Sequence, residues 1–532
     1  MPSKHFDALV VGAGFSGLYQ LYKLRELGLS VQLVEIGEDV GGTWYWNHYP
    51  GASSDTYSHV YRYSWDKEDL QTYPWDSTYL TQPEVHSYLR HVADKHHLRD
   101  LIQFNTGLTA ARYDESLNVW QIELSTKELL TTHYLVTALG PLSRQNVPSI
   151  KNIDFFQGQV YHSADWPKHH DFSDKRVGII GNGSTGSQLL VALAKHAKHV
   201  TSFQRTPQWN VPNNKRSVTA EERAKINADY DRIWNEVFDS RLAFGFKESN
   251  ISTFSVSDGE RQKMYEEEWN RGNGATLMAV FNDIVLDKRA NETVCDFMRG
   301  KIAEAVKDPE TRCRLTPTEP FARRPITNDG YYETFNRDNV RLVSLRETPI
   351  DEMVKTGLKT SDGIIHRLDV LILATGFDAC TGIYNKVDIR GRNGETLKAH
   401  WANGASAYLG VSVPGFPNLF TVFGPNAPFV NMPPAAETQV RFITDLIQRA
   451  GNNGVVDSQS DAEKQWTDLS NQILQASLLS KVATWATGKN IPGKKATSLF
   501  FMGGLKMYRQ LLDDVVSKGY TGFDIHQGPP RS

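Results

Sequence analysis

Two glycine-rich stretches have the spacing that binds the pyrophosphate of a dinucleotide. Gly12, Gly14 and Gly17 form G-x-G-x-x-G directly after an apolar run, residues 8–11, that suits a buried parallel strand. A helix and a second apolar run should follow, ending in Glu35, where a carboxylate can accept hydrogen bonds from the hydroxyl groups of an adenosine ribose. Loop, helix and terminal acid together predict a dinucleotide site, whereas the glycine turn alone would also suit a purely structural role.

The second stretch repeats this spacing but lacks the acid. Its glycines are Gly181, Gly183 and Gly186. The position that corresponds to Glu35 holds Gln204, and Arg205 and Thr206 follow it. A carboxylate would repel a 2′-phosphate, whereas a guanidinium and a hydroxyl bind it through charge-assisted hydrogen bonds. The second site is therefore expected to bind NADP rather than NAD, unless Arg205 is only a solvated surface arginine.

Two dinucleotide sites in one chain predict hydride transfer between two cofactors. With NADPH in the second site, FAD is the expected occupant of the first, because a flavin accepts hydride and passes electrons on singly or to oxygen. Two apolar runs that end in glycine, within residues 134–143 and 368–379, bracket the second unit. We therefore expect the second unit to be inserted into the first.

The fold class expected from these stretches is α/β. It comprises two Rossmann-like dinucleotide-binding domains, with the NADP domain inserted in the FAD domain, plus a helical subdomain. The FAD domain is predicted to span 1–144 and 380–532, the NADP domain 145–212 and 316–379, and the helical subdomain 213–315. The helical subdomain is inferred from charged stretches with apolar residues at helical spacing, the first of them within residues 219–238.

Composition excludes several other classes of protein. With 532 residues, 40% hydrophobic and 22% charged, the chain should form a globular protein of two or three domains. A formal net charge of -3 gives no basic surface for nucleic acid, and no apolar run approaches the roughly 18 residues of a membrane span. The three cysteines match no disulfide framework, zinc site or CxxC pair. We expect a cytoplasmic protein with no metal, no nucleic acid, no membrane insertion and no obligate protein partner.

A dense stretch, FQGQVYHSADWP, lies at residues 156–167, ahead of the second glycine loop. It contains Phe156, Gly158 and His162, and it ends in a Trp166-Pro167 corner. From its residue types it could be a catalytic box or the joint between two nucleotide sites. For His162 alone, a histidine packed beside Trp166 is an equally good interpretation.

This stretch resembles the fingerprint of type I Baeyer-Villiger monooxygenases, FAD enzymes that use NADPH and oxygen to insert an oxygen atom beside a ketone carbonyl. GGTWYWNHYPGASSD (residues 41–55), GYYETFNRDNV, ATGFD and WATGKNIPGK are also similar to family signatures. The family's fingerprint lies on the connection between its two nucleotide domains. The resemblance therefore implies a joint, in which His162 orients the linker and the cofactor.

The resemblance also implies roles for the reactive residues. Arg324 corresponds to the arginine that keeps a C4a-peroxyflavin anionic while it attacks the ketone, which gives an ester or lactone. Asp55 corresponds to the aspartate that steers this arginine and lies by the flavin. Arg323 stands where the family commonly has a lysine on the 2′-phosphate, and His48 stands where it more often has arginine.

Three tryptophans complete the cofactor-binding residues that the resemblance implies. Trp485 is similar to a tryptophan that fixes the nicotinamide nucleotide, and Trp44 and Trp46 wall the flavin loop, although ordinary aromatic core would also explain the last two. Flavin-containing monooxygenases that oxidise sulfur or nitrogen share both glycine loops but usually lack the Trp-Pro ending. A flavin-dependent NADPH reductase and an NADP-sensing binding protein are the remaining alternatives. The sequence does not identify the ketone.

Overall fold

The computed structural model describes residues 4–526 of the chain. The first glycine unit lies at the centre of an eight-stranded sheet with the order β17-β4-β5-β6-β1-β2-β3, in which β18 also pairs with β6. Its strands are β1 (Lys4–Val11), β2 (Val31–Val34), β3 (Ile102–Gln103), β4 (Leu108–Asp114), β5 (Val119–Leu124), β6 (Leu129–Thr137), β17 (Asp388–Arg390) and β18 (Leu419–Thr421). β1 runs parallel to both β2 and β6. Its last four residues are buried, as expected for a central parallel strand.

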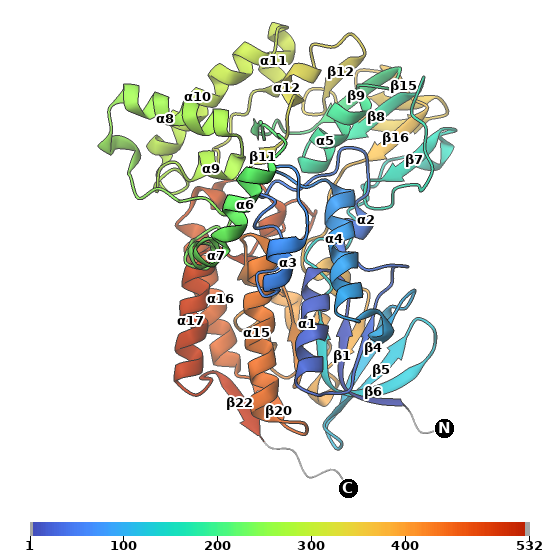
Figure 1. Cartoon of the computed structure of the whole chain (residues 1–532). Coiled ribbons are helices and arrows are strands. Elements are labelled where there is room, and N and C mark those ends of the chain that lie inside the picture. The colour runs from blue at the N-terminus through green and yellow to red at the C-terminus, as the bar shows by residue number, and fades with distance from the viewer. Residues whose placement is uncertain (1–3, 527–532) are drawn as a thin grey trace.

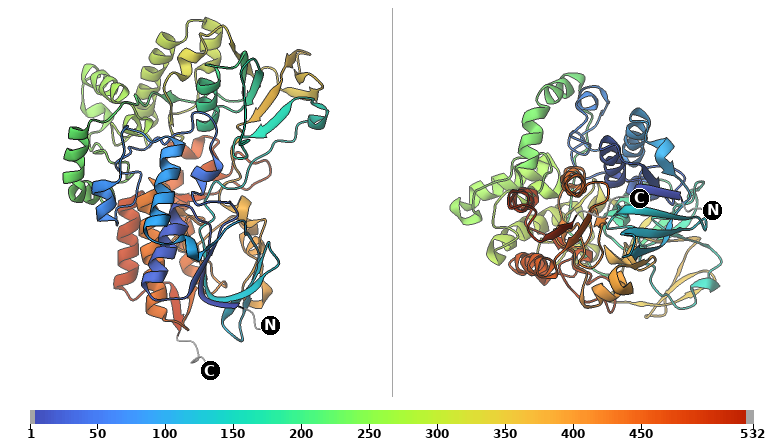
Figure 2. Two further views of the ribbon diagram at one scale, coloured as in Figure 1. Left: turned by 45° about the vertical axis from the view of Figure 1, so that its right-hand side comes forward. Right: turned by 90° about the horizontal axis from the view of Figure 1, so that it is seen from below.

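Helices from both ends of the chain pack together beside this sheet. Figure 1 shows four of them standing side by side in the lower half of the molecule. They are α1 (Phe15–Glu26), α15 (Met432–Ala450), α16 (Ser460–Gln475) and α17 (Leu505–Ser517). Residues far apart in sequence therefore build one domain, and both described ends of the chain lie at its lower edge (Figure 2).

The second glycine unit forms a separate sheet of five parallel strands with the order β12-β9-β8-β16-β7. Its strands are β7 (Gln159–His162), β8 (Arg176–Ile180), β9 (His199–Gln204), β12 (Val340–Ser344) and β16 (Val370–Leu373), and α5 (Ser184–Leu193) follows β8. This sheet occupies the upper right of Figure 1. The chain leaves the first sheet after β6 and returns to it at β17. The expected fold class, with one Rossmann-like domain inserted in the other, is confirmed.

The two glycine loops are packed in the same way. Gly12 and Gly181 have φ angles of +104° and +105°. A Cβ atom would lie 2.6 Å from the carbonyl oxygen of Ala138 at Gly12 and 2.3 Å from that of Ala374 at Gly181. Glycine is therefore required at both positions, because any other residue would strain the backbone at this φ angle and its Cβ would clash with the carbonyl oxygen. Ala138 and Ala374 follow the two strands that were expected to bracket the second unit.

The helices of residues 213–315 do not share one core. They are α6 (Ala220–Ala228), α7 (Tyr230–Phe238), α8 (Asp258–Arg271), α9 (Gly274–Met278), α10 (Lys288–Ala305) and α11 (Pro309–Leu315). Tyr230 and Trp234 of α7 pack in the core beside the eight-stranded sheet, whereas Tyr265 of α8 and Met298 of α10 pack with the five-stranded sheet. Helical spacing predicts that a helix buries one face, but not which core receives that face. The boundaries given for the helical subdomain stay a prediction.

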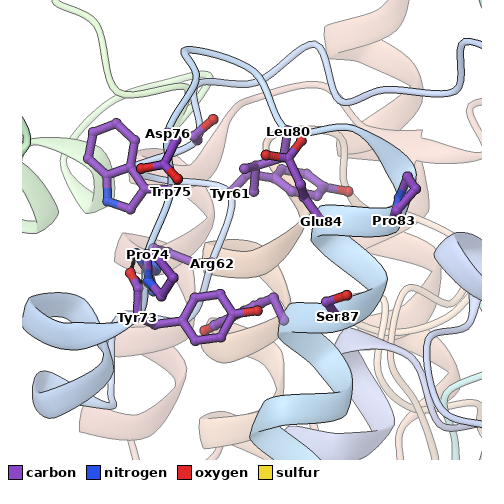
Figure 3. Close-up of a pocket in the computed structure, with 12 residues that line it drawn as sticks. Tyr61, Arg62, Tyr73, Pro74, Trp75, Asp76, Leu80, Pro83, Glu84 and Ser87 are labelled. Atoms are coloured by element: carbon purple, nitrogen blue, oxygen red, sulfur yellow. Dashed lines mark hydrogen bonds between the residues drawn. The ribbon is translucent and has the colours of Figure 1, made fainter. Parts of the chain in front are cut away.

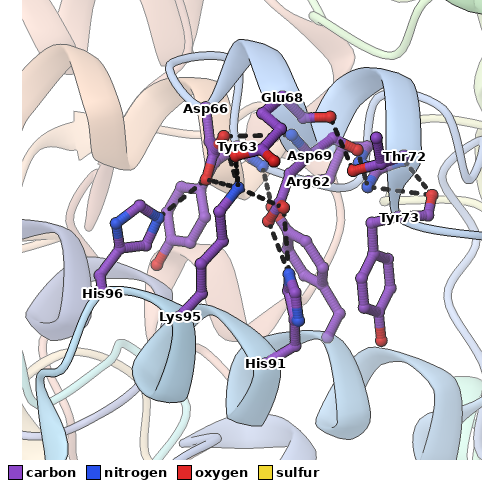
Figure 4. A network of polar contacts seen from close by, with 11 residues as sticks. Arg62, Tyr63, Asp66, Glu68, Asp69, Thr72, Tyr73, His91, Lys95 and His96 are labelled. Carbon is purple, nitrogen blue, oxygen red and sulfur yellow. Dashed lines mark hydrogen bonds and ion pairs between the residues drawn. The ribbon is translucent and has the colours of Figure 1, made fainter.

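A buried ion network fixes α3 (Lys67–Thr72) against α4 (Gln82–Lys95) (Figure 4). Lys95 Nζ lies 2.7 Å from Asp69 and 2.9 Å from Asp66, while His91 and His96 contact the same two carboxylates at 3.0 Å and 2.8 Å. Burial opposes the ionisation of Asp66, but hydrogen bonds from Lys95, the Asp69 N–H and His96 together more than offset it and bring the pKa of Asp66 below its usual value. The network holds the segment between the two helices in place.

Among residues 4–526, no helix has the length and apolar character needed to cross a lipid bilayer. The same part of the chain gathers no group of three or more histidine, cysteine or carboxylate side chains that could hold a metal ion.

Candidate active site

The first glycine loop opens a helix whose N-terminal amides are not capped. Gly14 is the N-cap of α1, and no side chain caps this end, so backbone donors remain for a phosphate. Glu35 is buried and accepts hydrogen bonds from the N–H groups of Ala13 at 2.7 Å and Gly37 at 2.8 Å. Burial raises the pKa of Glu35. Its carboxylate is thus fixed beside the loop, in a position that suits a dinucleotide ribose.

Gly41 and Gly42 begin a segment, residues 41–55, that approaches this loop and is called the tryptophan segment below. A Cβ at Gly42 would lie 2.9 Å from Gly14 Cα, so the close approach of the two backbones requires glycine at position 42. α2 (Thr43–Trp46) follows at once. The Trp44 indole is buried and donates to the Tyr61 hydroxyl at 3.1 Å, whereas Trp46 is 37% exposed. These features fit a flavin nucleotide held between the glycine loop and the tryptophan segment.

In the second glycine loop, the fold requires glycine at one position and leaves room for a side chain at another. A Cβ at Gly186 would lie 2.0 Å from the Gly181 carbonyl oxygen, so Gly186 is required by helix packing. At Gly183, by contrast, no heavy atom beyond its neighbours in the chain lies within 4 Å of an added Cβ. Gly183 is also the N-cap of α5, again without a side-chain cap. Since the fold does not require glycine at 183, the loop fits a phosphate that approaches its backbone.

Arginines from three segments gather at the end of β9. Arg205 is exposed and has no ion-pair partner within the described residues. Arg346 Nη2 donates to the Thr206 hydroxyl at 3.3 Å. Arg323 Nη1 donates to the Gln208 side chain at 3.1 Å, and its guanidinium also pairs with Glu319. Burial is the main cause that lowers the pKa of Arg323. The nearby positive charges of Arg346 and Arg205 lower it further.

Arg324 and Asp55 form an ion pair. Arg324 Nη2 lies 2.5 Å from Asp55 Oδ2 and donates to Oδ1 at 2.7 Å. The side chains are 37% and 18% exposed, so the pair borders solvent-accessible space. The Asp55 carbonyl oxygen accepts a hydrogen bond from Asn273 Nδ2 at 3.1 Å. Residues 269 positions apart in the sequence are thus brought together, and a third segment fixes the acid.

The tyrosines around this pair stay neutral. Burial raises the pKa of Tyr49 to about 12 and also raises the pKa of Tyr61, with smaller effects of Asp55 and Arg324 on both. Tyr49 donates to the Gln188 side chain at 2.8 Å. These hydroxyls can orient neighbours through hydrogen bonds but are poor proton acceptors at neutral pH. Arg324 therefore supplies a permanent charge next to neutral polar groups.

Trp485 lies in an aromatic cluster of the C-terminal segment. Its ring meets Phe429 edge-on at 5.3 Å between centroids and Phe500 at 5.6 Å. Two residues earlier, the Ala483 carbonyl oxygen accepts a hydrogen bond from Arg323 Nε at 2.8 Å. The segment with Trp485 thus packs against the arginine next to Arg324.

The fingerprint stretch begins as an edge strand of the second sheet. A Cβ at Gly158 would lie 2.4 Å from the Asp369 carbonyl oxygen, so glycine is required where β7 approaches the start of β16. Phe156 is buried in the core beside this sheet. His162 ends β7, where burial lowers its pKa. Its Nδ1 accepts from the Ala164 N–H at 3.1 Å, and its buried Nε2 has no hydrogen-bond partner within residues 4–526.

The end of the fingerprint contacts the tryptophan segment of the first domain. Trp166 is 4% exposed, its ring lies 6.4 Å from that of Tyr49, and Pro167 follows it. His48 places Nε2 3.1 Å from the Trp166 carbonyl oxygen and Nδ1 3.0 Å from that of Tyr45. The stretch therefore connects the two sheets and supplies none of the charged side chains of the Arg324 pair.

A separate cavity of about 280 Å³ lies behind Tyr61, between α4 and the preceding loop (Figure 3). Its walls are Ser58, Tyr61, Arg62, Tyr73, Pro74, Trp75, Asp76, Leu80, Pro83, Glu84, Ser87 and Tyr88. None of the residues predicted to bind a cofactor or to react lines it. We therefore do not place the chemistry there.

Three residues of the site were missed from the sequence. Arg346 belongs to no motif and reaches the site from the segment after β12. Asn273 has a φ of +115°, and an asparagine after glycine gives only a weak sequence signal for such a turn. Ile36, directly after Glu35, is 64% exposed and offers an apolar surface beside that acid. Of the three, only Ile36 could have been found from the sequence, as an apolar residue directly after an acid at the end of a strand.

Relatives of known activity match the whole chain. A family model described as flavin-binding monooxygenase-like matches residues 6–218, which include both glycine loops. The chain is 47% identical to a phenazine N-monooxygenase of Lysobacter antibioticus, over 99% of this chain and 98% of that protein. It is 45% identical to a cyclohexanone 1,2-monooxygenase of Acinetobacter sp, over 98% of this chain and 96% of that protein.

Solved structures agree with these relatives. A closed crystal structure of cyclohexanone monooxygenase has a TM-score of 0.97 and 45% identity, covering 99% of this chain and all of that one. The enzyme from Rhodococcus sp. Phi1, bound to NADP+, gives the same TM-score, identity and share of this chain. The predicted enzyme class and the cofactors FAD and NADP(H) are confirmed. The chain belongs to the type I Baeyer-Villiger monooxygenase family.

Proposed function

We propose that this chain converts a ketone into an ester or lactone by Baeyer-Villiger oxidation. Ketone, O2, NADPH and a proton give ester, NADP+ and water, so one oxygen atom enters the product and the other leaves as water. The observation that carries the proposal is the Arg324–Asp55 ion pair, which joins the tryptophan segment of the FAD half to the NADP half. When bound, FAD supplies hydride acceptance from NADPH and electron transfer to oxygen.

Arg324 is the residue to which we assign electrostatic catalysis. A guanidinium keeps its proton at any working pH, so its charge favours an anionic nucleophile over the protonated form. Attack on a ketone carbonyl requires that anion, and the negative charge moves to the carbonyl oxygen as the new C–O bond forms. Asp55 positions the guanidinium, and Asn273 positions Asp55.

Binding residues for the nucleotides are assigned by the same geometry. Glu35 and the uncapped start of α1 would hold FAD, with Trp44 and Trp46 along the flavin loop. Arg205, Thr206 and Arg323 would hold the 2′-phosphate of NADPH. Arg346, from its contact with Thr206, joins them.

Trp485 is assigned to the nicotinamide nucleotide because its segment packs on Arg323. For the fingerprint we propose the role of a joint. His162 accepts a hydrogen bond from the Ala164 N–H, and burial lowers its pKa, which suits a neutral residue that orients the backbone rather than one that transfers protons. The contacts of Trp166 with His48 and Tyr49 support this role, because they connect the linker with the flavin segment.

Oxygenation of a ring nitrogen is the second candidate. It is favoured by the relative named as a phenazine N-monooxygenase, at 47% identity. Oxygen transfer to nitrogen needs an electrophilic, protonated oxygen donor, whereas attack on a ketone needs the anion. The permanent charge of Arg324 therefore favours the ketone reaction.

A product panel tests the choice between them. FAD-loaded protein is incubated with NADPH, ¹⁸O2 and either cyclohexanone, cyclopentanone, acetone or phenazine, and products are identified by mass spectrometry. We expect an ester or lactone with one labelled oxygen from at least one ketone. Labelled phenazine N-oxide with no ester from any ketone would favour the second candidate.

The natural substrate is proposed only as a ketone, with O2 as co-substrate. A location in the cytoplasm and the absence of an obligate protein partner stay predictions.

A further inference from the structure

An acid lies within the arginine cluster that is expected to bind the 2′-phosphate. Glu319 pairs with Arg323, four residues along the chain, and lies 3.7 Å from Arg346 Nη2. Its backbone is held as well, because the Trp209 indole donates to the Glu319 carbonyl oxygen at 3.0 Å. The Glu319 and Arg323 side chains are 32% and 18% exposed, so the pair is partly shielded from water.

This acid competes with the phosphate for the same donors. A phosphate monoester carries about -1.5 to -2 charges at neutral pH and accepts charge-assisted hydrogen bonds from guanidinium groups. Arg323 and Arg346 already face Glu319. A 2′-phosphate must therefore displace the carboxylate from them or bind beside a like charge, and both lower its affinity.

The same acid suits a cofactor without the phosphate. In NAD the ribose carries a 2′-hydroxyl, which can donate to a carboxylate, as acids at strand ends of NAD-binding domains accept it. Gln204, which occupies that position in this domain, is buried and donates to the Arg314 carbonyl oxygen at 2.8 Å. Glu319 is the carboxylate that pairs with both Arg323 and Arg346 at this end of β9.

We propose that Glu319 is a specificity-determining residue that lowers the preference of this enzyme for NADPH over NADH. The proposal rests on the assignment of Arg205, Arg323 and Arg346 to the 2′-phosphate. In addition, the Glu319 carboxylate is the counter-ion that the 2′-phosphate must displace from Arg323 and Arg346.

Binding of phosphorylated and unphosphorylated fragments tests the proposal without turnover. Calorimetry on FAD-loaded protein would compare adenosine 2′,5′-bisphosphate with 5′-AMP in wild type and Glu319→Gln. We expect the variant to bind the bisphosphate about threefold to tenfold more tightly and 5′-AMP with unchanged or weaker affinity. Glu310→Gln, which removes an exposed partner of Arg314, is the matched control and should change neither affinity. Unchanged or weaker binding of the bisphosphate by Glu319→Gln would overturn the proposal, because Glu319 would then be neutral or would hold Arg323 in place.

Arg346→Gln separates this proposal from the assignment on which it rests. If Arg346→Gln weakens binding of the bisphosphate while Glu319→Gln does not tighten it, only the role of Glu319 is wrong. If Arg346→Gln leaves the affinity unchanged, the 2′-phosphate site itself is misassigned. In turnover, the ratio of kcat/KM for NADPH to that for NADH should rise in Glu319→Gln by at least the factor by which binding of the bisphosphate tightens. A ratio that falls would contradict the proposal.

Discussion

At the scale of single residues, the Arg324–Asp55 pair combines a permanent charge with a fixed direction. Asp55 is held from two sides, since its carboxylate accepts from Arg324 and its backbone carbonyl accepts from Asn273. An arginine side chain has many rotamers, so a fixed carboxylate reduces the entropy lost when the guanidinium is placed for reaction. In the proposed mechanism the acid acts through the arginine and does not take part in the reaction itself.

Replacing Asp55 should therefore impair oxygenation more than cofactor binding. In Asp55→Asn we expect bound FAD to remain and ester formation per enzyme to fall about 10-fold to 100-fold, because the guanidinium loses its charged partner. The measurement is the initial rate of ester formation at saturating NADPH, together with the flavin absorbance of the purified protein. Asp76→Asn, at an acid whose side chain is 77% exposed, is the control. An unchanged ester rate in Asp55→Asn would remove Asp55 from the account.

At the scale of elements, the two glycine loops use glycine for two different physical reasons. Gly186 is needed because helix α5 packs on the loop, whereas Gly183 faces no protein atom that excludes a side chain. The two reasons predict separable effects on folding and on binding.

Gly183→Ala should leave the protein folded and weaken NADP+ binding, since its methyl group would occupy the approach of the pyrophosphate. We expect at least a 10-fold rise in the Kd for NADP+, with the FAD content and thermal midpoint unchanged. Gly186→Ala, where the methyl group would meet the Gly181 carbonyl oxygen, should instead lower the thermal midpoint or prevent folding. Equal loss of stability in both variants would show that Gly183 has a packing role.

His400 provides a pH-dependent contact between α14 (Leu397–His400) and α16. Its Nε2 lies 3.1 Å from a carboxylate oxygen of Glu463. Burial lowers the pKa of His400, but Glu463 and Glu395 more than offset this, so the pKa is raised. A raised pKa in the folded state means that the contact stabilises the fold fully below about pH 6.5, the usual histidine value, and that this is lost as the pH rises through the folded pKa.

Replacing His400 should therefore lower the stability of the fold most in mild acid. We expect His400→Gln to lose about 1 kcal/mol of stability at pH 5.5 and to approach wild type by pH 8.5. Thermal unfolding of FAD-loaded protein at both pH values gives the comparison, with His169→Gln, at an exposed histidine, as control. A difference that grows with pH would reverse the assigned sign.

What the sequence predicts well is what short segments determine. The glycine spacings and the residues at the ends of β2 and β9 are local, so Glu35, Arg205 and the inserted-domain order could be inferred without coordinates. Asp55 and Arg324 needed the family resemblance, because nothing local brings together side chains 269 positions apart. Arg346 and Asn273 lie in loops placed by tertiary packing, and no motif marks them. Which of the two cores α7 packs against depends on how the two domains meet, and the helical spacing of apolar residues does not predict this.

At the scale of the whole molecule, the two nucleotide halves meet along the tryptophan segment. Tyr49 donates to Gln188 of α5, and His48 lies against Trp166 of the fingerprint. Asp55, at the end of the same segment, reaches Arg324. One stretch of the FAD half therefore contacts the NADP sheet, the linker and Arg324. A change in the relative orientation of the two domains should therefore alter all three contacts.

The most direct test of this account is the ester formed per NADPH consumed, measured in wild type and in Arg324→Ala with a ketone that wild type accepts. We predict a ratio near one for wild type. For the variant we predict a ratio below about 0.01, with bound FAD, continued NADPH oxidation and hydrogen peroxide in place of ester. Arg367→Ala, at an exposed arginine of β15 (Ile365–Arg367), should keep the wild-type ratio. If Arg324→Ala forms ester at the wild-type ratio, the permanent charge of Arg324 does not direct the reaction and the account is wrong.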